Sequence, residues 1–268
     1  ENTANSSPLL VSVLSGKGGV GKSVLTLNLA ERAASLGVRT LAVDLSMASG
    51  DIHLLANASP RFGIESYAAG THPLSQSVTP LSPSCDLLLR TATGPIGAIE
   101  SGHDAAAICE RLRHDSQKYD LIICDHGSGM STVATTIALH SDLNLLVIVP
   151  ELTSIADGYG LFKYLTERDR HVDCRLVINR TKSSTDADYV SGKFAEMTDK
   201  FLRVSPRFGG WVPDDPAVGQ AVSVQRPLAA VAPNSVVVQQ ITRISQALCD
   251  ELSGRRSAVR PNEFSGRG

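Results

Sequence analysis

Residues 15–23 read SGKGGVGKS and combine four glycines with two lysines and a terminal hydroxyl. The segment satisfies the pattern GxxxxGK[ST], in which backbone N–H groups surround phosphate oxygens, a lysine reaches the β- and γ-phosphates and a hydroxyl ligates Mg²⁺. Lys22 and Ser23 fill the last two roles, so we predict a site for ATP or ADP with Mg²⁺. The predicted phosphate-binding residues are Gly16, Lys17, Gly18, Gly19, Val20, Gly21, Lys22, Ser23 and Val24.

Two aspartates stand at the ends of apolar runs that we interpret as strands. Asp44 lies in the run 40–45, and Asp125 ends the run 120–125. In open α/β sheets, ligands bind beyond the carboxyl ends of the strands. A single aspartate in such a place is often only a cap for a turn or helix, but two of them flanking the strand before a phosphate loop favour a shared site.

Short apolar runs alternate along the chain with longer segments of helical periodicity. The predicted strands are 9–14, 40–45, 86–89, 120–125, 143–149 and 175–179, and the predicted helices are 23–36, 104–113, 132–140, 154–168, 186–202 and 234–252. The strands are apolar throughout, as expected when helices cover both faces of a parallel sheet. We predict one α/β domain of the P-loop NTPase fold, with a doubly wound, mostly parallel sheet.

This domain is expected to span residues 9–252, with 1–8 and 253–268 disordered and 56–84 an irregular excursion. A net charge of −2 offers no global basic field, so no specific nucleic-acid partner is predicted. The five scattered cysteines lack a CxxC pair, which favours reduced thiols in the cytoplasm. The tail SGRRSAVRPNEFSGRG cannot build a sustained apolar face. We therefore predict weak or no direct membrane binding, with at most transient location at the membrane or cell pole.

The early lysine, Lys17, identifies the loop further. KGGxGK[ST] resembles the deviant phosphate loop of the MinD/ParA group of ATPases. Later segments resemble, in order and spacing, the FlhG/FleN branch, MinD-like regulators of flagellar number and position. These segments read VDLSMASGDIHLLANASPRFGI, ICDHGSGMS, VPELTSIADGYGLFKYL and GGWVPDDPAVGQAVSVQRPL. The resemblance covers roughly residues 9–252.

This resemblance implies roles for individual residues. Lys17 would reach across a homodimer to the partner's ATP, and Asp125 would hold Mg²⁺ together with Ser23. Gly127 and Gly129 would form a switch that senses the γ-phosphate. The residues implied in catalysis are Lys17, Lys22, Asp44 and Asp125, and those implied in contacts with adenine are Asn179, Arg180, Pro213 and Asp214.

The chain departs from the branch at Ser46, where the family carries the second aspartate of a DxD motif that positions the attacking water. A serine hydroxyl cannot accept a proton at neutral pH. Losing a general base typically costs about 10²–10⁴-fold in rate, so we predict slow intrinsic hydrolysis. Asp51 is a possible substitute. His126 is also unusual, and two interpretations are compatible with the sequence: a contact with the γ-phosphate or an attacking water, or a surface or packing role.

The resulting prediction is an ATP-dependent dimeric switch acting through protein partners in flagellar or other polar-organelle placement. Two relatives of different role remain as alternatives, a MinD-type division-site ATPase and a pilus-localisation ATPase of the TadZ/CpaE type. A metabolic enzyme on the same fold, such as a cobyrinate amidase or dethiobiotin synthetase relative, is a second alternative. No motif for a carboxylate substrate favours it.

Overall fold

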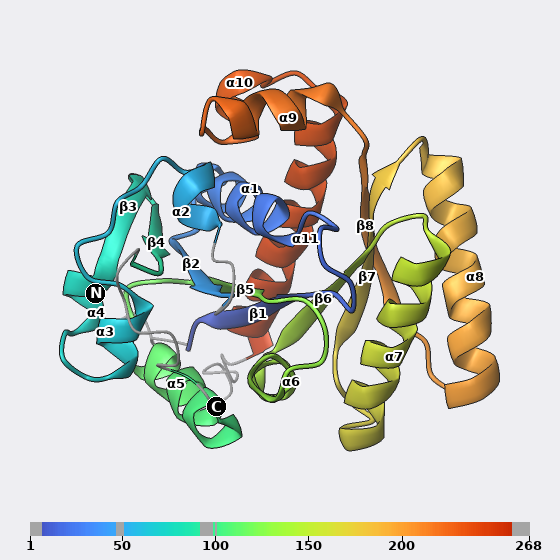
Figure 1. Cartoon of the computed structure of the whole chain (residues 1–268), viewed down its shortest axis with the longest axis horizontal. Coiled ribbons are helices and arrows are strands. Elements are labelled where there is room, and N and C mark those ends of the chain that lie inside the picture. The colour runs from blue at the N-terminus through green and yellow to red at the C-terminus, as the bar shows by residue number, and fades with distance from the viewer. Residues whose placement is uncertain (1–6, 47–50, 92–98, 100, 259–268) are drawn as a thin grey trace, which may run out of the picture.

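A single mixed sheet forms the centre of the molecule. The computed structural model describes residues 7–46, 51–91, 99 and 101–258. Within them, the sheet has the strand order β3-β4-β2-β5-β1-β6-β7-β8 (Figure 1), and only the β3–β4 pair is antiparallel. The strands are β1 (Leu9–Leu14), β2 (Thr40–Leu45), β3 (Val78–Ser82), β4 (Cys85–Leu88), β5 (Leu121–His126), β6 (Leu143–Ile148), β7 (Cys174–Thr181) and β8 (Arg207–Pro213).

Helices cover both faces of this sheet, which confirms the predicted fold class. The longer helices are α1 (Lys22–Ser35), α5 (Gly102–Asp115), α6 (Thr132–His140), α7 (Leu152–Arg168), α8 (Ser184–Leu202), α9 (Pro216–Ser223) and α11 (Val236–Ala258). The short ones are α2 (Ile52–Leu55), α3 (Ile64–Ala68), α4 (Leu74–Ser77) and α10 (Leu228–Val231). Helices α1 and α11 pack on one face, and α5, α6, α7 and α8 on the other (Figure 1).

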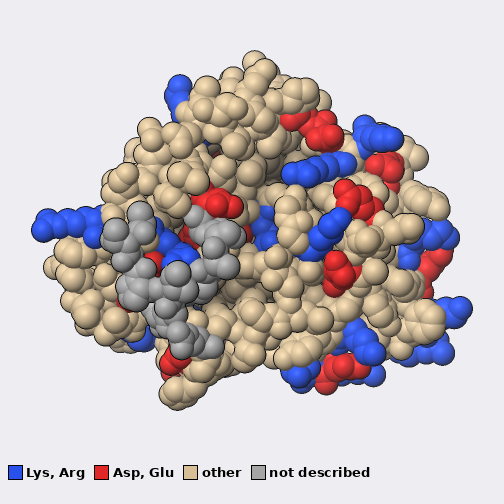
Figure 2. All heavy atoms as spheres, in the orientation of Figure 1, with Lys and Arg blue, Asp and Glu red and all other residues tan. Residues whose placement is uncertain are grey.

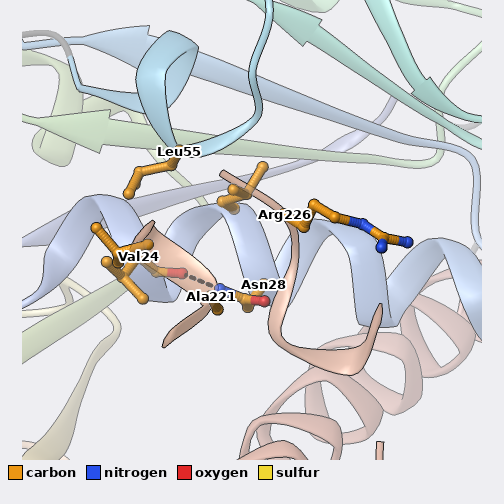
Figure 3. Close-up of a pocket in the computed structure, with 7 residues that line it drawn as sticks. Val24, Asn28, Leu55, Ala221 and Arg226 are labelled. Atoms are coloured by element: carbon orange, nitrogen blue, oxygen red, sulfur yellow. Dashed lines mark hydrogen bonds between the residues drawn. The ribbon is translucent and has the colours of Figure 1, made fainter. Parts of the chain in front are cut away.

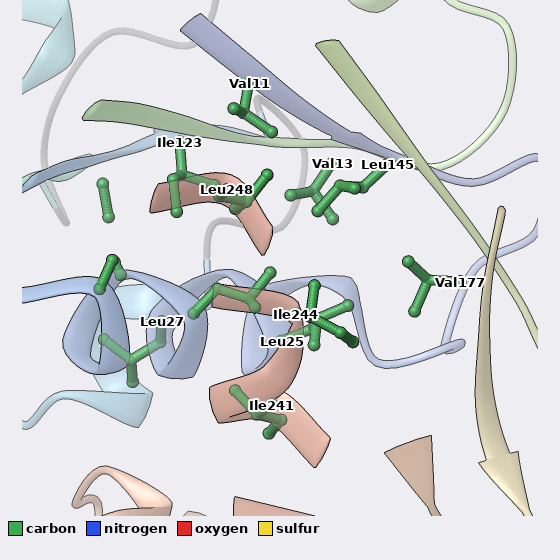
Figure 4. Packing of buried hydrophobic residues seen from close by; sticks show 14 of the residues in the cluster. Val11, Val13, Leu25, Leu27, Ile123, Leu145, Val177, Ile241, Ile244 and Leu248 are labelled. Atoms are coloured by element: carbon green, nitrogen blue, oxygen red, sulfur yellow. The ribbon is translucent and has the colours of Figure 1, made fainter. Parts of the chain in front are cut away.

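The strands are apolar on both sides because each side meets helices. Val11 and Val13 of β1 point to the face covered by α1 and α11 and belong to the same core cluster as Leu25 of α1 and Ile244 of α11 (Figure 4). Leu10 points to the opposite face. Burial on both faces explains why the sequence shows continuous apolar runs rather than alternation.

Three parts of the chain differ from the sequence prediction. Strand β8 was not predicted, because its sequence RFGGWVP contains two glycines and no apolar run. The excursion 56–84 includes α3, α4 and the antiparallel edge strand β3. The predicted disordered tail is wrong for 253–258, which continue α11, while 1–6 and 259–268 lie outside the described residues.

The sheet order places the middle strand β1 between β5 and β6, with β2 on the far side of β5. Asp44 and Asp125 are register partners in the β2–β5 pair, so their side chains start from adjacent positions at the carboxyl edge. Among the described residues, no helix has the length and hydropathy needed to cross a bilayer.

Candidate functional site

The phosphate loop connects β1 to α1 through two left-handed glycines. Gly19 has φ of 73° and Gly21 has φ of 92°, a region that residues with a Cβ rarely adopt. A Cβ on Gly21 would also lie 2.5 Å from Nδ2 of Asn179. Helix α1 begins directly after Gly21, and no side chain in the described structure caps it. Its first N–H groups and the positive end of its dipole are therefore available to bind an anion such as a phosphate group.

The loop is held in place by two close contacts with other elements. A Cβ on Gly16 would lie 2.2 Å from the carbonyl oxygen of Asp157 in α7, so only glycine allows this approach. At the other end of the loop, Nδ2 of Asn179 donates to the carbonyl oxygen of Val20 at 2.7 Å. These contacts fix the loop before any ligand binds, which reduces the ordering cost of binding.

Lys22 is the buried cation of the site. Its side chain is folded under the loop, where Nζ donates to Oγ of Ser15 at 2.8 Å, and the residue is only 8% exposed. Burial lowers the pKa of Lys22, while the charge of Asp125 acts in the opposite direction. The ammonium group of Lys22 is therefore already largely desolvated before a phosphate group binds.

Asp44 and Asp125 are completely buried, and Oδ2 of each carboxylate has no hydrogen-bond partner within the described residues. Burial raises the pKa of Asp44 to about 6. Burial, reinforced by the charge of Asp44, raises the pKa of Asp125 to about 7. Unpaired buried carboxylates are costly, so this arrangement calls for a cation.

Magnesium fits this donor set because it prefers carboxylate and hydroxyl oxygens. The Ser23 hydroxyl hydrogen-bonds Asp125, so the two predicted metal ligands lie together. Thr26 Oγ1 lies 3.5 Å from Oδ1 of Asp125 and keeps that oxygen oriented. Ser23 and Asp125 would hold the ion, which supplies charge neutralisation of phosphate oxygens when bound.

Lys17 points away from the cradle and contacts the N-terminus of α7. Its Nζ lies 2.5 Å from Oε2 of Glu151 and 2.9 Å from Oγ1 of Thr153. The ion pair lowers the pKa of Glu151 and is solvent-exposed. On the face shown in Figure 2, basic and acidic side chains are interspersed over α7 and α8. Lys17 is thus part of a charged outer surface, while Lys22 is part of the interior.

The predicted base contacts converge on one pocket beside the loop. Asn179, Arg180, Pro213 and Asp214 line it together with Gly21 and Val24, and the remaining walls are apolar side chains from α1, β8, α9, α10 and α11. The pocket encloses about 440 Å³, counting solvent at its open mouth. Apolar walls with a few polar groups at the rim suit a planar heterocycle.

The backbone around this pocket is strained. Arg180 has φ of 56°, and its N–H donates to Oδ1 of Asn179 at 3.0 Å. The β7–β8 register shifts between Ile178 and Thr181, where the extra residue turns Arg180 outward. Strain of this kind persists where surrounding contacts fix the backbone, and it is common at ligand sites.

A smaller cavity lies on the other side of Val24, between α1, α2 and α9 (Figure 3). Leu55, Ala221 and Arg226 line it, and the Asn28 amide donates to the carbonyl oxygen of Val24 at 2.7 Å. Its walls are mainly apolar, and the Asn28 side chain is already used in holding α1 to α10 through the Leu228 N–H. This cavity therefore does not resemble a phosphate site.

Residues 127–130, which we call the switch segment because the resemblance predicts a γ-phosphate switch there, rest against the phosphate loop. The Gly129 N–H donates to the carbonyl oxygen of Ser15 at 3.0 Å, and Oγ of Ser128 lies 3.4 Å from the position of a Cβ on Gly18. Ser46 is buried, its N–H donates to Oδ1 of Asp44 at 3.1 Å, and its Oγ lies 3.9 Å from the position of a Cβ on Gly127. Ser46, where the resemblance predicts an aspartate, therefore lies beside the switch segment.

His126 and Asp51 occupy different surroundings. His126 is 1% exposed and bonds Ser12 rather than the phosphate loop, because its side chain points to the opposite face of β5 from Asp125. This favours the packing alternative over a contact with phosphate. Asp51 is exposed at the start of α2, and its charge contributes to the raised pKa of Asp44.

Sequence reasoning missed three residues that hold the predicted ones. Ser15 accepts from Lys22 and donates to the Lys17 carbonyl oxygen at 2.7 Å, and its position directly before Gly16 was a usable signal. Glu151 and Thr153 hold Lys17, but nothing in the sequence indicates that α7 begins beside the loop.

A glycine-rich turn at an uncapped helix, with a buried lysine and two unpaired carboxylates across from it, defines a P-loop nucleotide-binding domain. The model of the CobQ/CobB/MinD/ParA nucleotide binding domain matches residues 11–228. The chain belongs to this family, and within it to the MinD/ParA-like ATPases.

Individual relatives agree with this assignment. The chain is 27% identical to the antiactivator FleN of Pseudomonas aeruginosa over 84% of its length and 81% of the relative. It is 26% identical to the septum site-determining protein MinD of Helicobacter pylori over 88% of its length and 89% of the relative.

Solved structures share the fold. MinD of Pyrococcus horikoshii, complexed with Mg-ADP, matches with a TM-score of 0.77 at 19% identity, covering 93% of this chain and 98% of that one. MinD in the MinC:MinD complex of Aquifex aeolicus matches with a TM-score of 0.75 at 21% identity, covering 96% and 100%.

Proposed function

We propose that this protein binds ATP·Mg²⁺, dimerises on it and acts as a MinD-like switch in flagellar or other polar-organelle placement, with slow intrinsic hydrolysis. The observation that carries the proposal is a complete phosphate loop beside a missing carboxylate. Lys22, Ser23 and Asp125 lie at the predicted phosphate-binding site. The resemblance predicts a water-positioning aspartate at residue 46, where this chain has a buried serine.

Dimerisation rests on Lys17. A lysine side chain that reaches the nucleotide of a partner subunit must first give up its contacts within its own subunit. Its present partners, Glu151 and Thr153, lie at the surface, where water and salt weaken an ion pair. A γ-phosphate from a second copy would compete successfully with this contact.

Light scattering after gel filtration tests the dimer with ATP, ADP and no nucleotide. We expect a dimer with ATP alone, and a monomer for Lys17→Ala that still binds nucleotide. Lys22→Ala is the matched control, since it should lose nucleotide binding itself. A dimer in all three conditions would contradict the switch and favour a metabolic enzyme of the same fold.

Slow hydrolysis rests on Ser46. A hydroxyl beside Gly127 can hydrogen-bond a water but cannot take its proton at neutral pH. We expect Ser46→Asp to raise the rate by about 10-fold or more, and Ser46→Ala to leave it nearly unchanged. Wild-type turnover equal to that of an ordinary MinD, measured without partners, would refute this part of the proposal.

The base is proposed to be adenine, contacted by Asn179, Arg180, Pro213 and Asp214 at the mouth of the 440 Å³ pocket. A fluorescent ATP analogue displaced by ATP and ADP but not by GTP would support this assignment. The working domain is proposed to begin at Leu9 and to end with α11, so that the tail starts after Ala258 rather than at Ser253.

The biological role is supported by the similarity to FleN and by the flagellum site-determining protein YlxH of Helicobacter pylori, which is 21% identical over 90% of this chain. Deleting the gene in its own host should change the number or position of flagella. A change in septum position instead would favour the MinD role, since MinD relatives have nearly the same identity. Direct membrane binding is proposed to be weak, and pelleting with anionic vesicles and ATP tests this.

A further inference from the structure

Three hydrogen bonds, one buried and two partly buried, connect His126, the residue directly before the switch segment, to the C-terminal end of α6. Nε2 of His126 lies 2.9 Å from Oγ of Ser12, and that Oγ lies 2.8 Å from Oγ of Ser141. Oγ of Ser141 in turn lies 2.8 Å from the carbonyl oxygen of Ile137 in the last turn of α6. Ser12 is completely buried in the middle of β1.

The direction of each bond follows from the number of protons. The Ile137 carbonyl can only accept, so the single hydroxyl proton of Ser141 goes to it. The hydroxyl proton of Ser12 then goes to Ser141, and Ser12 must accept from His126. His126 therefore carries a proton on Nε2 and donates it to Ser12, so that each of the three side chains donates one hydrogen bond.

Both ends of the switch segment are attached to the same helix. His126 precedes the segment and reaches the C-terminal turn of α6 through Ser12 and Ser141. Ser131 follows the segment and caps the N-terminus of α6, where its Oγ accepts from the Ala134 N–H at 3.2 Å. The segment 127–130 therefore spans two anchors whose separation is set by α6.

The middle of the segment touches the phosphate loop, since the Gly129 N–H donates to the Ser15 carbonyl oxygen and Ser15 Oγ accepts from Lys22. Gly129 has φ of 86°, which allows a bend here without disturbing either anchor. If the His126 anchor were lost, the start of the segment could shift in spite of this bend.

We propose that His126 is a positioning residue for ATP hydrolysis, which acts through Ser12 and Ser141 by fixing the switch segment between α6 and the phosphate loop. This inference rests on the proposed ATPase function. It gives α6 a role in controlling turnover, although α6 itself does not line the nucleotide pocket.

Steady-state kinetics test the proposal with His126→Ala, Ser12→Ala and the double variant. We expect each single variant to lower kcat by about 10-fold, because sub-ångström misplacement of a reacting group is costly. The KM for ATP should stay within about twofold, since the phosphate cradle is intact. The double variant should lose no more than the larger single loss, because both changes break one chain. His126→Gln, whose amide can donate to Ser12, should recover most of the rate.

Hydrogen exchange of residues 127–131 gives a readout that does not require hydrolysis. We expect faster exchange in His126→Ala and Ser12→Ala without nucleotide. Thr166→Val is the matched control. Thr166 is buried like Ser12, and its hydroxyl donates to the carbonyl oxygen of Phe162, four residues earlier in α7, far from the switch segment in sequence. Its kcat and exchange in 127–131 should match the wild type.

The outcomes separate this inference from the function on which it rests. If the wild-type protein binds ATP but does not hydrolyse it, the proposed ATPase function is wrong. Hydrogen exchange would still show whether the hydrogen bonds of His126 and Ser12 hold residues 127–130 in place. Unchanged exchange and kcat in both His126→Ala and Ser12→Ala would overturn the inference. Additive losses in the double variant would do so as well.

Discussion

Aspartates at the two edges of the sheet differ in the partners that the chain provides for their carboxylates. At the carboxyl edge, Asp44 and Asp125 each keep an unpartnered oxygen within the described structure, and burial raises the pKa of both. At the amino edge, Asp142 accepts from the Leu10 N–H at 2.8 Å and from Arg113 at 2.9 Å, and pairs with Arg255 at 2.9 Å. Burial acts to raise the pKa of Asp142, but these partners lower it overall.

Other acids at the amino edge follow the same rule. Asp120 receives both the backbone N–H and the guanidinium of Arg39. Arg175 of β7 pairs with Glu251 of α11 at 2.6 Å. Asp120 and Asp142 thus find their partners within the chain, whereas Asp44 and Asp125 each keep an oxygen without one among the described residues. The difference indicates that Asp120 and Asp142 stabilise the fold, whereas the burial of Asp44 and Asp125 costs stability in favour of ligand binding.

The largest expected contrast is in activity. Asp125→Asn should lower kcat for ATP by at least about 10²-fold, because the loss of the proposed Mg²⁺ ligand would remove several kcal/mol of charge stabilisation. Asp142→Asn, the matched change at the amino edge, should lower it by less than about threefold below its unfolding temperature. Phosphate-release assays on both variants measure the contrast, and equal losses would remove the distinction between the edges.

Alanine substitutions of two glycines, one in the phosphate loop and one toward the amino edge of the sheet, should have different effects on ATP binding. Gly16→Ala would place a Cβ 2.2 Å from the Asp157 carbonyl oxygen, so it should displace the loop and weaken ATP binding by about 10-fold or more. Gly37, which follows α1 toward the amino edge, has φ of 89° and no atom within 4 Å of the position of a Cβ. Gly37→Ala should cost about 1 kcal/mol of stability and leave ATP affinity unchanged, as calorimetric titration would show.

Asp142→Asn should destabilise the protein by about 2 kcal/mol at neutral pH, because it removes a partly buried charge that pairs with two arginines. The pKa of Asp142 is lower in the folded than in the unfolded chain, so its contribution is present above the ordinary value of 3.8 and is lost as the pH falls through the folded pKa. Urea unfolding at several pH values measures this. A penalty that grows on acidification would contradict the assignment.

Asp125→Asn should have the opposite effect in protein without nucleotide or Mg²⁺. The folded pKa of about 7 exceeds the ordinary 3.8, so the wild type loses stability as the pH rises through this window. The variant should be more stable by about 2 kcal/mol near pH 8 and show little gain near pH 4. Saturating Mg-ADP should reverse the order, because the wild type alone keeps the metal ligand. A stabilising effect at low pH only would be inconsistent with unpaired carboxylates.

The sequence predicted the central strands and the longer helices well. Their apolar runs are continuous because both faces of the sheet are buried, and the glycine pattern before Lys22 has few other uses. It missed β8, whose glycines lie against Arg175 and Ile244 and whose pairing depends on β7 and α11. It also missed the end of α11, where Arg255 pairs with Asp142, more than a hundred residues away in sequence.

The candidate site divides in the same way. Lys22, Ser23, Asp44 and Asp125 could be proposed from residue type and strand ends alone. The partners of Lys17 and the surroundings of His126 could not, because strand order sets which segments meet and the sequence does not specify it. His126 follows Asp125 directly, yet strand alternation places it on the other face, against Ser12.

The sequence by itself determined that this chain carries a phosphate loop of the MinD/ParA type, since that motif is local and its glycines are needed for backbone geometry. Only the tertiary structure decided which charges remain unpaired. Whether a carboxylate removed from solvent is costly depends on which groups the fold places beside it. Asp142 meets two arginines from α5 and α11, while Asp44 and Asp125 meet each other.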